Sequence, residues 1–299
     1  MNKDLSIYDI RKILKDCLGF KEINILQIEK LGGLTNKNYK VSTNNCNYVL
    51  RLPGDGTEQF INRENEYECN TLANKLNIDS ELLFFNTKKG IKVTKYIEQA
   101  ETMSKTKFAG NKELIKEVAC IFQKLHMSKF DTNGYFDIFS MINEYENIIK
   151  KTNVMFWKDY KNIRNIVRKL NDELNKINIR KTLCHNDPLC ENFILGLDRM
   201  YLIDWEYSGM NDPMWDLADF IIEADLNNND ELLLCKFYDP GKTIVNMERR
   251  ISINKVFVDF LWALWALMKY GLEKDRNMLI WANERYERSK KNLFKIIII

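Results

Sequence analysis

The sequence predicts an α+β protein with a small β-rich N-terminal lobe and a larger, mostly helical C-terminal lobe. Short apolar runs separated by turn residues are confined to the first third of the chain, whereas long helical apolar periodicity dominates beyond about residue 110. The 299 residues, 45% of them apolar, are enough for two packed lobes. We therefore expect an N-terminal lobe over residues 1–97 and a C-terminal lobe over 98–299, with a ligand cleft between them.

The elements of the first lobe follow one another in a clear order. Residues 1–20 have a helical apolar stripe that stops at Gly19. Apolar runs interrupted by Gly-Gly, Asn-Asn and Lys-Lys-Gly turns then predict strands. These strands are expected near residues 23–31, 39–42, 48–52, 82–85 and 91–97. A helix carrying Glu64, Glu66 and Glu68 is expected over 61–76, between the third and fourth strands.

Composition argues against several kinds of partner. The net charge is only +3, and the Lys and Arg residues are spread along the chain, so neither nucleic acid nor an anionic membrane is expected. The longest apolar run, Phe260–Met268, is about half the ~20 residues of a membrane span, so stable membrane insertion is not expected either. Seven cysteines without a C-x-x-C pair, and no secretory signal, predict a reduced cytoplasmic protein. The oligomeric state is left open, a homodimer included.

Two features of the first lobe are suited to phosphate groups but are not specific for them. The Gly32-Gly33 turn lets backbone N–H groups approach an anion, although a plain hairpin explains such a turn equally well. Arg51 ends an apolar strand and is interpreted either as a phosphate-binding cation or as an exposed strand end. A glutamate of the 61–76 helix could hold it, but periodicity does not say which one.

The most specific pattern lies in the second lobe. His185-x-Asp187-x-x-x-x-Asn192 is followed twelve residues after Asn192 by Asp204, at the end of a short apolar run. This is the order of groups that phosphoryl transfer from ATP needs, with a base for the acceptor hydroxyl and two oxygen ligands for Mg²⁺. We predict that Asp187 is the base, that Asn192 and Asp204 are the metal ligands, and that His185 braces the loop. Asp216 is expected to anchor this loop from below.

The last helices carry a pair of tryptophans with two interpretations. Trp262 and Trp265 are three residues apart and therefore share a helix face. Two indole faces beside a carboxylate would attract a quaternary ammonium group. Without further information, a pair of core tryptophans is the simpler explanation. His126, at the end of an apolar helix, is expected to be a hydrogen-bonded structural histidine.

Together, these stretches resemble the choline/ethanolamine kinase family. The resemblance is closest to its bacterial LicA-type choline kinases, within the aminoglycoside-phosphotransferase and protein-kinase-like superfamily, and it covers roughly residues 25–290. Six motifs carry it: Gly32-Gly33-Leu34-Thr35-Asn36, Tyr48-Val49-Leu50-Arg51-Leu52-Pro53-Gly54, Arg63-x-x-Glu66, His185-Asn186-Asp187-x-x-x-x-Asn192, Ile203-Asp204-Trp205-Glu206-Tyr207 and Trp262-x-x-Trp265. Arg51 stands where the wider superfamily has lysine, and an arginine there is usual for choline kinases.

The resemblance implies a bilobal protein-kinase-like fold and specific roles for residues. It implies that Asp187 is the catalytic base, that Asn192 and Asp204 hold Mg²⁺, and that Glu66, with Glu64 next, pairs with Arg51. ATP would be bound by Gly32, Gly33, Thr35, Asn36, Arg51 and Glu66, and the backbone around Ile97 and Glu98 would hold its adenine. The choline pocket would be formed by Tyr207, Glu223, Trp262 and Trp265, which now favours the pocket interpretation of the tryptophans.

The implied activity is ATP- and Mg²⁺-dependent phosphorylation of choline, giving phosphocholine and ADP. Ethanolamine is the nearest alternative acceptor, and two tryptophans favour choline because a primary ammonium prefers hydrogen-bond acceptors. An aminoglycoside acceptor is less expected, since a polycation would need many carboxylates. A catalytically inactive nucleotide-binding module is disfavoured because the base and metal positions all carry competent residues.

Overall fold

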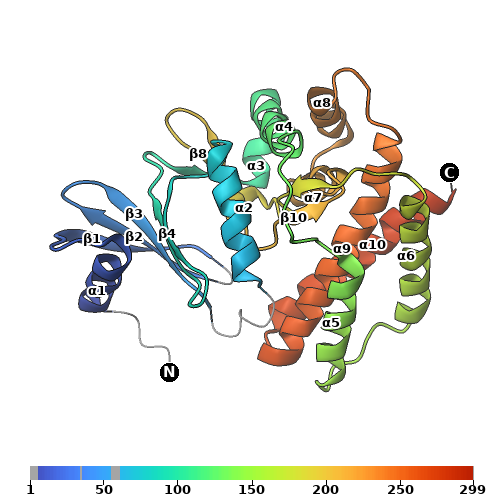
Figure 1. Cartoon of the computed structure of the whole chain (residues 1–299). Helices are drawn as coiled ribbons and strands as arrows, with labels where there is room; N and C mark the ends of the chain where they lie inside the picture. Colours follow the sequence, from blue (N-terminus) through green and yellow to red (C-terminus); the bar gives the residue numbers. More distant parts are fainter. Residues whose placement is uncertain (1–5, 34–35, 55–60, 299) are drawn as a thin grey trace. The chain divides into compact units, whose positions relative to one another are not determined.

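The computed structural model describes residues 6–33, 36–54 and 61–298 (Figure 1). It confirms the α+β class, with a β-sheet near the N-terminus and helices dominating the C-terminal part. The chain divides into two compact units. The N-terminal unit contains Met1–Met103 and Glu191–Ser208, and the C-terminal unit contains Ser104–Cys190 and Gly209–Ile299.

The N-terminal unit is built on an antiparallel five-stranded sheet. Its strands, in spatial order, are β1 (Ile25–Leu31), β2 (Lys37–Thr43), β3 (Asn47–Leu52), β5 (Ile91–Lys95) and β4 (Leu82–Asn86). Strands β2 and β3, and likewise β4 and β5, are joined by short turns, which antiparallel pairing allows, whereas helix α2 lies between β3 and β4 in the chain. The strands expected from the turn-punctuated apolar runs are therefore present, with ends shifted by a few residues.

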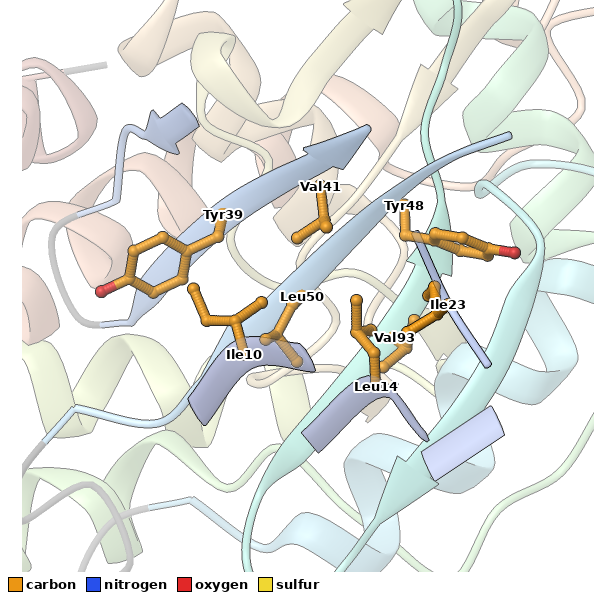
Figure 2. Packing of buried hydrophobic residues seen from close by; sticks show 8 residues of the cluster. All are labelled: Ile10, Leu14, Ile23, Tyr39, Val41, Tyr48, Leu50 and Val93. Carbon is orange, nitrogen blue, oxygen red and sulfur yellow. The ribbon is translucent and has the colours of Figure 1, made fainter. Parts of the chain in front are cut away.

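Helix α1 (Ile7–Leu18) covers part of this sheet (Figure 2). Ile10 and Leu14, one helical turn apart, pack against apolar side chains of the central strands. These strand residues are Tyr39, Val41, Tyr48, Leu50 and Val93, together with Ile23 before β1. The helix begins at a capping box formed by Ser6 and Asp9, and it ends at Gly19 in a left-handed conformation.

A second helix and a small sheet complete the N-terminal unit. Helix α2 (Arg63–Lys75) begins after Asn62, whose side chain accepts hydrogen bonds from two backbone N–H groups of the first turn. The small sheet consists of β6 (Glu101–Thr102), β8 (Phe193–Leu195) and β9 (Met200–Leu202), in the order β6-β8-β9. Strand pairing thus groups residues 191–208 with the N-terminal unit, although they lie far along the chain. The lobe boundary at residue 97 remains a prediction.

The C-terminal unit is mostly helical. Its helices are α3 (Lys105–Phe108), α4 (Lys112–His126), α5 (Ile138–Lys150), α6 (Tyr160–Asn175), α7 (Met214–Glu223), α8 (Asn228–Tyr238), α9 (Met247–Glu273) and α10 (Arg276–Ile298). The short helix η2 (Cys190–Asn192) lies where the two units meet in sequence. Strands β7 (Thr182–Cys184) and β10 (Gly209–Asn211) form an antiparallel pair. Figure 1 shows α5, α6 and α10 beside α9, which contacts all three and α7.

Helix α9 is the central helix of this unit. Among the described residues, it is the one helix long and apolar enough to cross a membrane, but 83% of its apolar window is buried inside the protein. A helix that is apolar on all sides and covered by other helices is typical of a domain core. We therefore interpret α9 as a core helix.

Candidate active site

The first candidate group surrounds a buried carboxylate of the N-terminal unit. Arg51 on β3 forms an ion pair with Glu66 on α2, and both side chains are almost inaccessible to solvent. Arg63 lies 2.7 Å and Lys92 3.7 Å from the same carboxylate. Of the two glutamates left open by the sequence, Glu66 makes the contact and Glu64 is exposed. Three cations therefore surround this one carboxylate, and two of them also contact further acids of the same unit, Asp204 and Glu206.

The electrostatics of Glu66 reflect these neighbours. Burial by itself would raise the pKa of its carboxyl group, but Arg51, Lys92 and Arg63 lower the pKa to about 2. The group is therefore charged in the folded protein across the ordinary pH range. The Arg51 guanidinium is in turn held between Glu66 and Asp204, with 3.8 Å between an Arg51 nitrogen and an Asp204 oxygen.

The two proposed metal ligands are brought together by a hairpin. Asn192 directly precedes β8 and Asp204 follows β9, and the Ile203 N–H donates to the Asn192 carbonyl at 2.9 Å. Asp204 has a positive φ of 70°, an uncommon conformation that Asp tolerates better than most residues. Its side chain remains 36% exposed although Arg51 lies beside it. A carboxylate and an amide oxygen are ligands suited to a hard cation such as Mg²⁺.

Glu206 is a buried acid at this site for which the sequence predicts no role. It accepts a hydrogen bond from the Asn36 amide at 3.0 Å and lies 3.4 Å from Arg63. Burial and the nearby Asp204 raise the pKa of Glu206 to about 7. Asn36, predicted to bind ATP, is thereby connected to the segment that carries Asp204. The place of Glu206 in the motif Ile203–Tyr207, two residues after Asp204, was the available signal.

The predicted phosphate loop is described in part. Gly32 and Gly33 are exposed, and Thr35 lies outside the described residues. Gly33 has a φ of 152°, and a Cβ there would lie 2.7 Å from the Asn36 backbone oxygen, so this turn requires glycine. Asn38 closes the turn by donating to the Gly32 carbonyl at 2.9 Å.

Ile97 and Glu98, predicted to hold adenine, directly follow β5 and lead toward β6. Ile97 packs so closely on Gly196 that a Cβ at Gly196 would lie 2.8 Å from the Ile97 side chain. Glu98 is exposed and accepts a hydrogen bond from Asn47 at 2.9 Å. Both residues belong to the N-terminal unit, and Ile97 lies next to the β8–β9 turn.

Asp187 lies in the C-terminal unit, on a loop whose backbone is fixed by Asp216. The Asp216 carboxylate accepts the N–H groups of His185 and Asn186, both at 2.8 Å. The Asp187 N–H donates to the His185 ring at 3.3 Å. The anchoring role expected for Asp216 and the bracing role expected for His185 are both confirmed. Asp187 itself is half-buried and directly follows these two anchored residues.

Asp216 is held in turn by His126. The His126 Nε2 lies 2.9 Å from Asp216, and the Nδ1 lies 2.8 Å from the hydroxyl of Tyr238. His126, Cys184 and Asp216 are buried, with possible metal-ligating atoms within 4.8 Å of one another. Because both His126 nitrogens and both Asp216 oxygens already form hydrogen bonds, we interpret the group as a loop anchor. The structural role expected for His126 is thus confirmed.

The aromatic group of the C-terminal unit contains three tryptophans. Trp262 and Trp265 on α9 lie edge to face, with ring centroids 6.4 Å apart. Trp281 on α10 lies edge to face with Trp265 at 5.8 Å. Trp262 is buried, whereas Trp265 and Trp281 are half-buried. Trp281 is not predictable from the sequence, because its partner Trp265 is on another helix and no spacing along the chain connects the two.

Glu223, predicted to bind the substrate cation, is paired inside the protein. It forms an ion pair with Arg285 on α10, whose guanidinium lies 4.7 Å from the Trp281 ring centroid. Arg285 also contacts Asp259 at 3.2 Å. The fourth predicted pocket residue, Tyr207, is half-buried and belongs to the N-terminal unit.

Comparison with known proteins connects these features to one family. Residues 28–239 match the family model described as choline/ethanolamine kinase. The chain is 30% identical over 256 residues to Protein LicA of Haemophilus influenzae, an alignment that covers 82% of this chain and 74% of that protein.

Solved structures point the same way. The crystal structure of choline kinase LicA from Streptococcus pneumoniae is 35% identical, has a TM-score of 0.84, and matches over 96% of this chain and 98% of that one. A LicA complex with AMP has a TM-score of 0.83, at 35% identity and with 96% of this chain and 97% of that chain covered. Spectinomycin phosphotransferase shares the fold, with a TM-score of 0.66 at 12% identity and coverage of 97% of this chain and 99% of that one.

The buried Glu66 cluster predicts a pH-dependent stability. The pKa of Glu66 is about 2 in the folded protein against an ordinary 4.5. Its contribution to the free energy of unfolding is therefore fully present above pH 4.5 and is lost as the pH falls toward 2. We expect Glu66→Gln to lower the free energy of unfolding in urea by about 3 kcal/mol at pH 7. The deficit should shrink below pH 4.5, because the Glu66 carboxylate of the unfolded chain is then protonated while that of the folded protein stays charged until the pH approaches 2.

Glu64→Gln is the matched control, since Glu64 is exposed on the same helix. It should change the free energy of unfolding by less than about 0.5 kcal/mol. A Glu66→Gln deficit that is independent of pH would contradict the proposed charge cluster.

Proposed function

The chain belongs to the choline/ethanolamine kinase family, and on this basis we propose that it transfers the γ-phosphoryl group of ATP to the hydroxyl of choline, giving phosphocholine and ADP. The observation that carries the choice of acceptor is the cluster of Trp262, Trp265 and Trp281 in a unit that also holds Glu223. Aromatic faces attract a quaternary ammonium, which has no hydrogen to donate. The similar LicA choline kinase of Streptococcus pneumoniae supports this choice.

The N-terminal unit would bind the nucleotide. Arg51, aligned by Glu66 and placed 3.8 Å from Asp204, would meet the phosphates with a cation that its neighbours already hold in place. The exposed Gly32–Gly33 turn would let backbone N–H groups approach the same anion. The AMP complex of a LicA protein supports an adenine nucleotide as the ligand of this family.

The oxygens of Asn192 and Asp204 fit Mg²⁺, and they are the residues that would hold it. When bound, the ion would neutralise charge on the phosphate oxygens during transfer. The hairpin bond between Ile203 and Asn192 keeps the two ligands in register before any ion arrives.

Asp187 would accept the proton of the acceptor hydroxyl. Its loop cannot shift freely, because Asp216 accepts hydrogen bonds from the two preceding N–H groups and is itself held by His126. Phosphoryl transfer depends chiefly on positioning and electrostatic stabilisation, so a base on a fixed loop suits this chemistry.

A cytoplasmic location is part of the proposal. All seven cysteines are free, which suits a reducing compartment. The acceptor would be a small molecule, and the modest net charge of +3 supports neither nucleic acid nor a membrane surface as a partner.

The direct test is ADP release with a panel of acceptors. We expect the highest kcat/KM with choline, a lower value with ethanolamine, and no turnover above background with spectinomycin or gentamicin. A higher kcat/KM for ethanolamine than for choline would show that ethanolamine is the preferred acceptor. Turnover with an aminoglycoside alone would overturn the proposal.

Two substitutions separate the proposed base from the proposed metal ligand. Asp187→Ala should abolish turnover, by roughly 10³-fold or more, and keep the affinity for Mg·ATP, because the base contacts the acceptor. Asp204→Ala should lower both turnover and nucleotide affinity, since it removes a metal ligand and the partner of Arg51. Isothermal titration with a non-hydrolysable ATP analogue measures the affinity. Normal turnover in either variant would refute its assigned role.

The tryptophan cluster predicts a selective effect on choline. Trp265→Ala should raise KM for choline by roughly 30-fold, the value of a desolvated cation–π contact, and should change KM for ATP less than about two-fold. Trp265→Phe keeps an aromatic face and should recover much of the loss. Equal changes in the KM values for choline and ATP would show that Trp265 does not line the acceptor pocket.

A further inference from the structure

Asp219 on α7 is a buried acid that neither the fold nor the proposed chemistry has used so far. Its side chain is inaccessible to solvent, and among the described residues neither carboxylate oxygen has a hydrogen-bond partner. An unpaired buried carboxyl group destabilises a protein, so its presence calls for a ligand or a neighbour that offsets the cost.

Asp219 lies on the same side of α7 as two acids that are already engaged. Asp216 is one turn before it and Glu223 one turn after it. The Asp216 carboxylate already accepts two hydrogen bonds from the backbone of the Asp187 loop. Glu223 is paired with Arg285. Asp219 is therefore the acid of this face that remains without a hydrogen-bonding partner in the described part of the chain.

The charges around the proposed acceptor site lead to the same residue. Glu223 and Asp259 contribute two negative charges, and Arg285 and Arg288 contribute two positive charges that contact them. These four groups compensate one another. These four groups therefore add no net charge that could balance the charge of a cationic substrate bound near Glu223.

We propose that Asp219 is a substrate-specificity residue that supplies the negative charge balancing the cationic group of the acceptor. This inference rests on the proposed function and deepens it, because it assigns the recognition of charge to a carboxylate other than the paired Glu223. The aromatic cluster would provide shape and π-faces, and Asp219 would provide the charge, which needs no hydrogen bond to the ammonium group.

The protonation of Asp219 is coupled to this role. Burial raises its pKa well above the ordinary 3.8, and the negative charges of Glu223, Asp187 and Asp216 act in the same direction. Arg285 and Arg288 of α10 oppose them. A cation arriving beside Asp219 favours its charged form, so binding would release one proton from the carboxyl O–H to solvent. Affinity for a cationic acceptor should accordingly rise with pH.

The test compares choline with its neutral isostere 3,3-dimethylbutan-1-ol, in which carbon replaces the charged nitrogen. We expect Asp219→Asn to lower kcat/KM for choline by roughly 30-fold, since one charge of a desolvated pair is lost. The value for the neutral alcohol should change less than about two-fold. Asp225→Asn, at an exposed position just beyond α7 with a φ of 49° that Asn tolerates, is the matched control and should leave both values unchanged.

Equal losses for both alcohols, or no loss for choline, would overturn the assignment of Asp219. A second measurement does not depend on folding of the variant. Equilibrium titration of the wild-type protein should give a Kd for choline that falls as the pH rises, while the Kd for the neutral alcohol stays constant. The same pH dependence for both ligands would also overturn it. If the wild-type protein phosphorylates neither alcohol, the proposed function fails, and the titration still decides whether Asp219 recognises a cation.

Discussion

The ion pair between Arg51 and Glu66 is the constraint on which the N-terminal unit depends. A carboxylate buried on α2 is tolerated only because strand β3 presents a guanidinium to it, with Arg63 and Lys92 close by. That requirement holds the helix and the sheet in one arrangement. The same guanidinium reaches Asp204 beyond β9, so the helix, the large sheet and the small hairpin meet at one cation.

The C-terminal unit follows the same rule with a different partner. The buried carboxylate of Asp216 is compensated by backbone N–H groups of the Asp187 loop and by the His126 ring. The cost of burying this acid is offset only when the loop has the observed conformation, so the acid selects that conformation. Arg285 plays the corresponding part for Glu223 and Asp259. Asp219 is a buried acid whose oxygens have no such hydrogen-bonding partner among the described residues. For this reason we assign it to the recognition of the substrate.

Much of the fold and of the candidate site could be predicted because the signals are local. Turn residues between apolar runs predicted the five strands of the large sheet, and helical periodicity predicted α1, α2 and the C-terminal helices. The spacing from Asp187 through Asn192 to Asp204 is also a property of the chain itself. Trp281 and the contact of Glu206 were not predicted, since their partners Trp265 and Asn36 are distant in sequence.

The sequence by itself determined the kinds of groups present and their order along the chain. A base, an amide, a carboxylate and a tryptophan pair are chemical facts that no folding is needed to establish. Only the tertiary structure decided which of them are paired. Glu66 rather than Glu64 meets Arg51, and Glu223 is already bound to Arg285, because burial and distance set the electrostatic energy of each acid. Neither quantity can be obtained from positions along the chain.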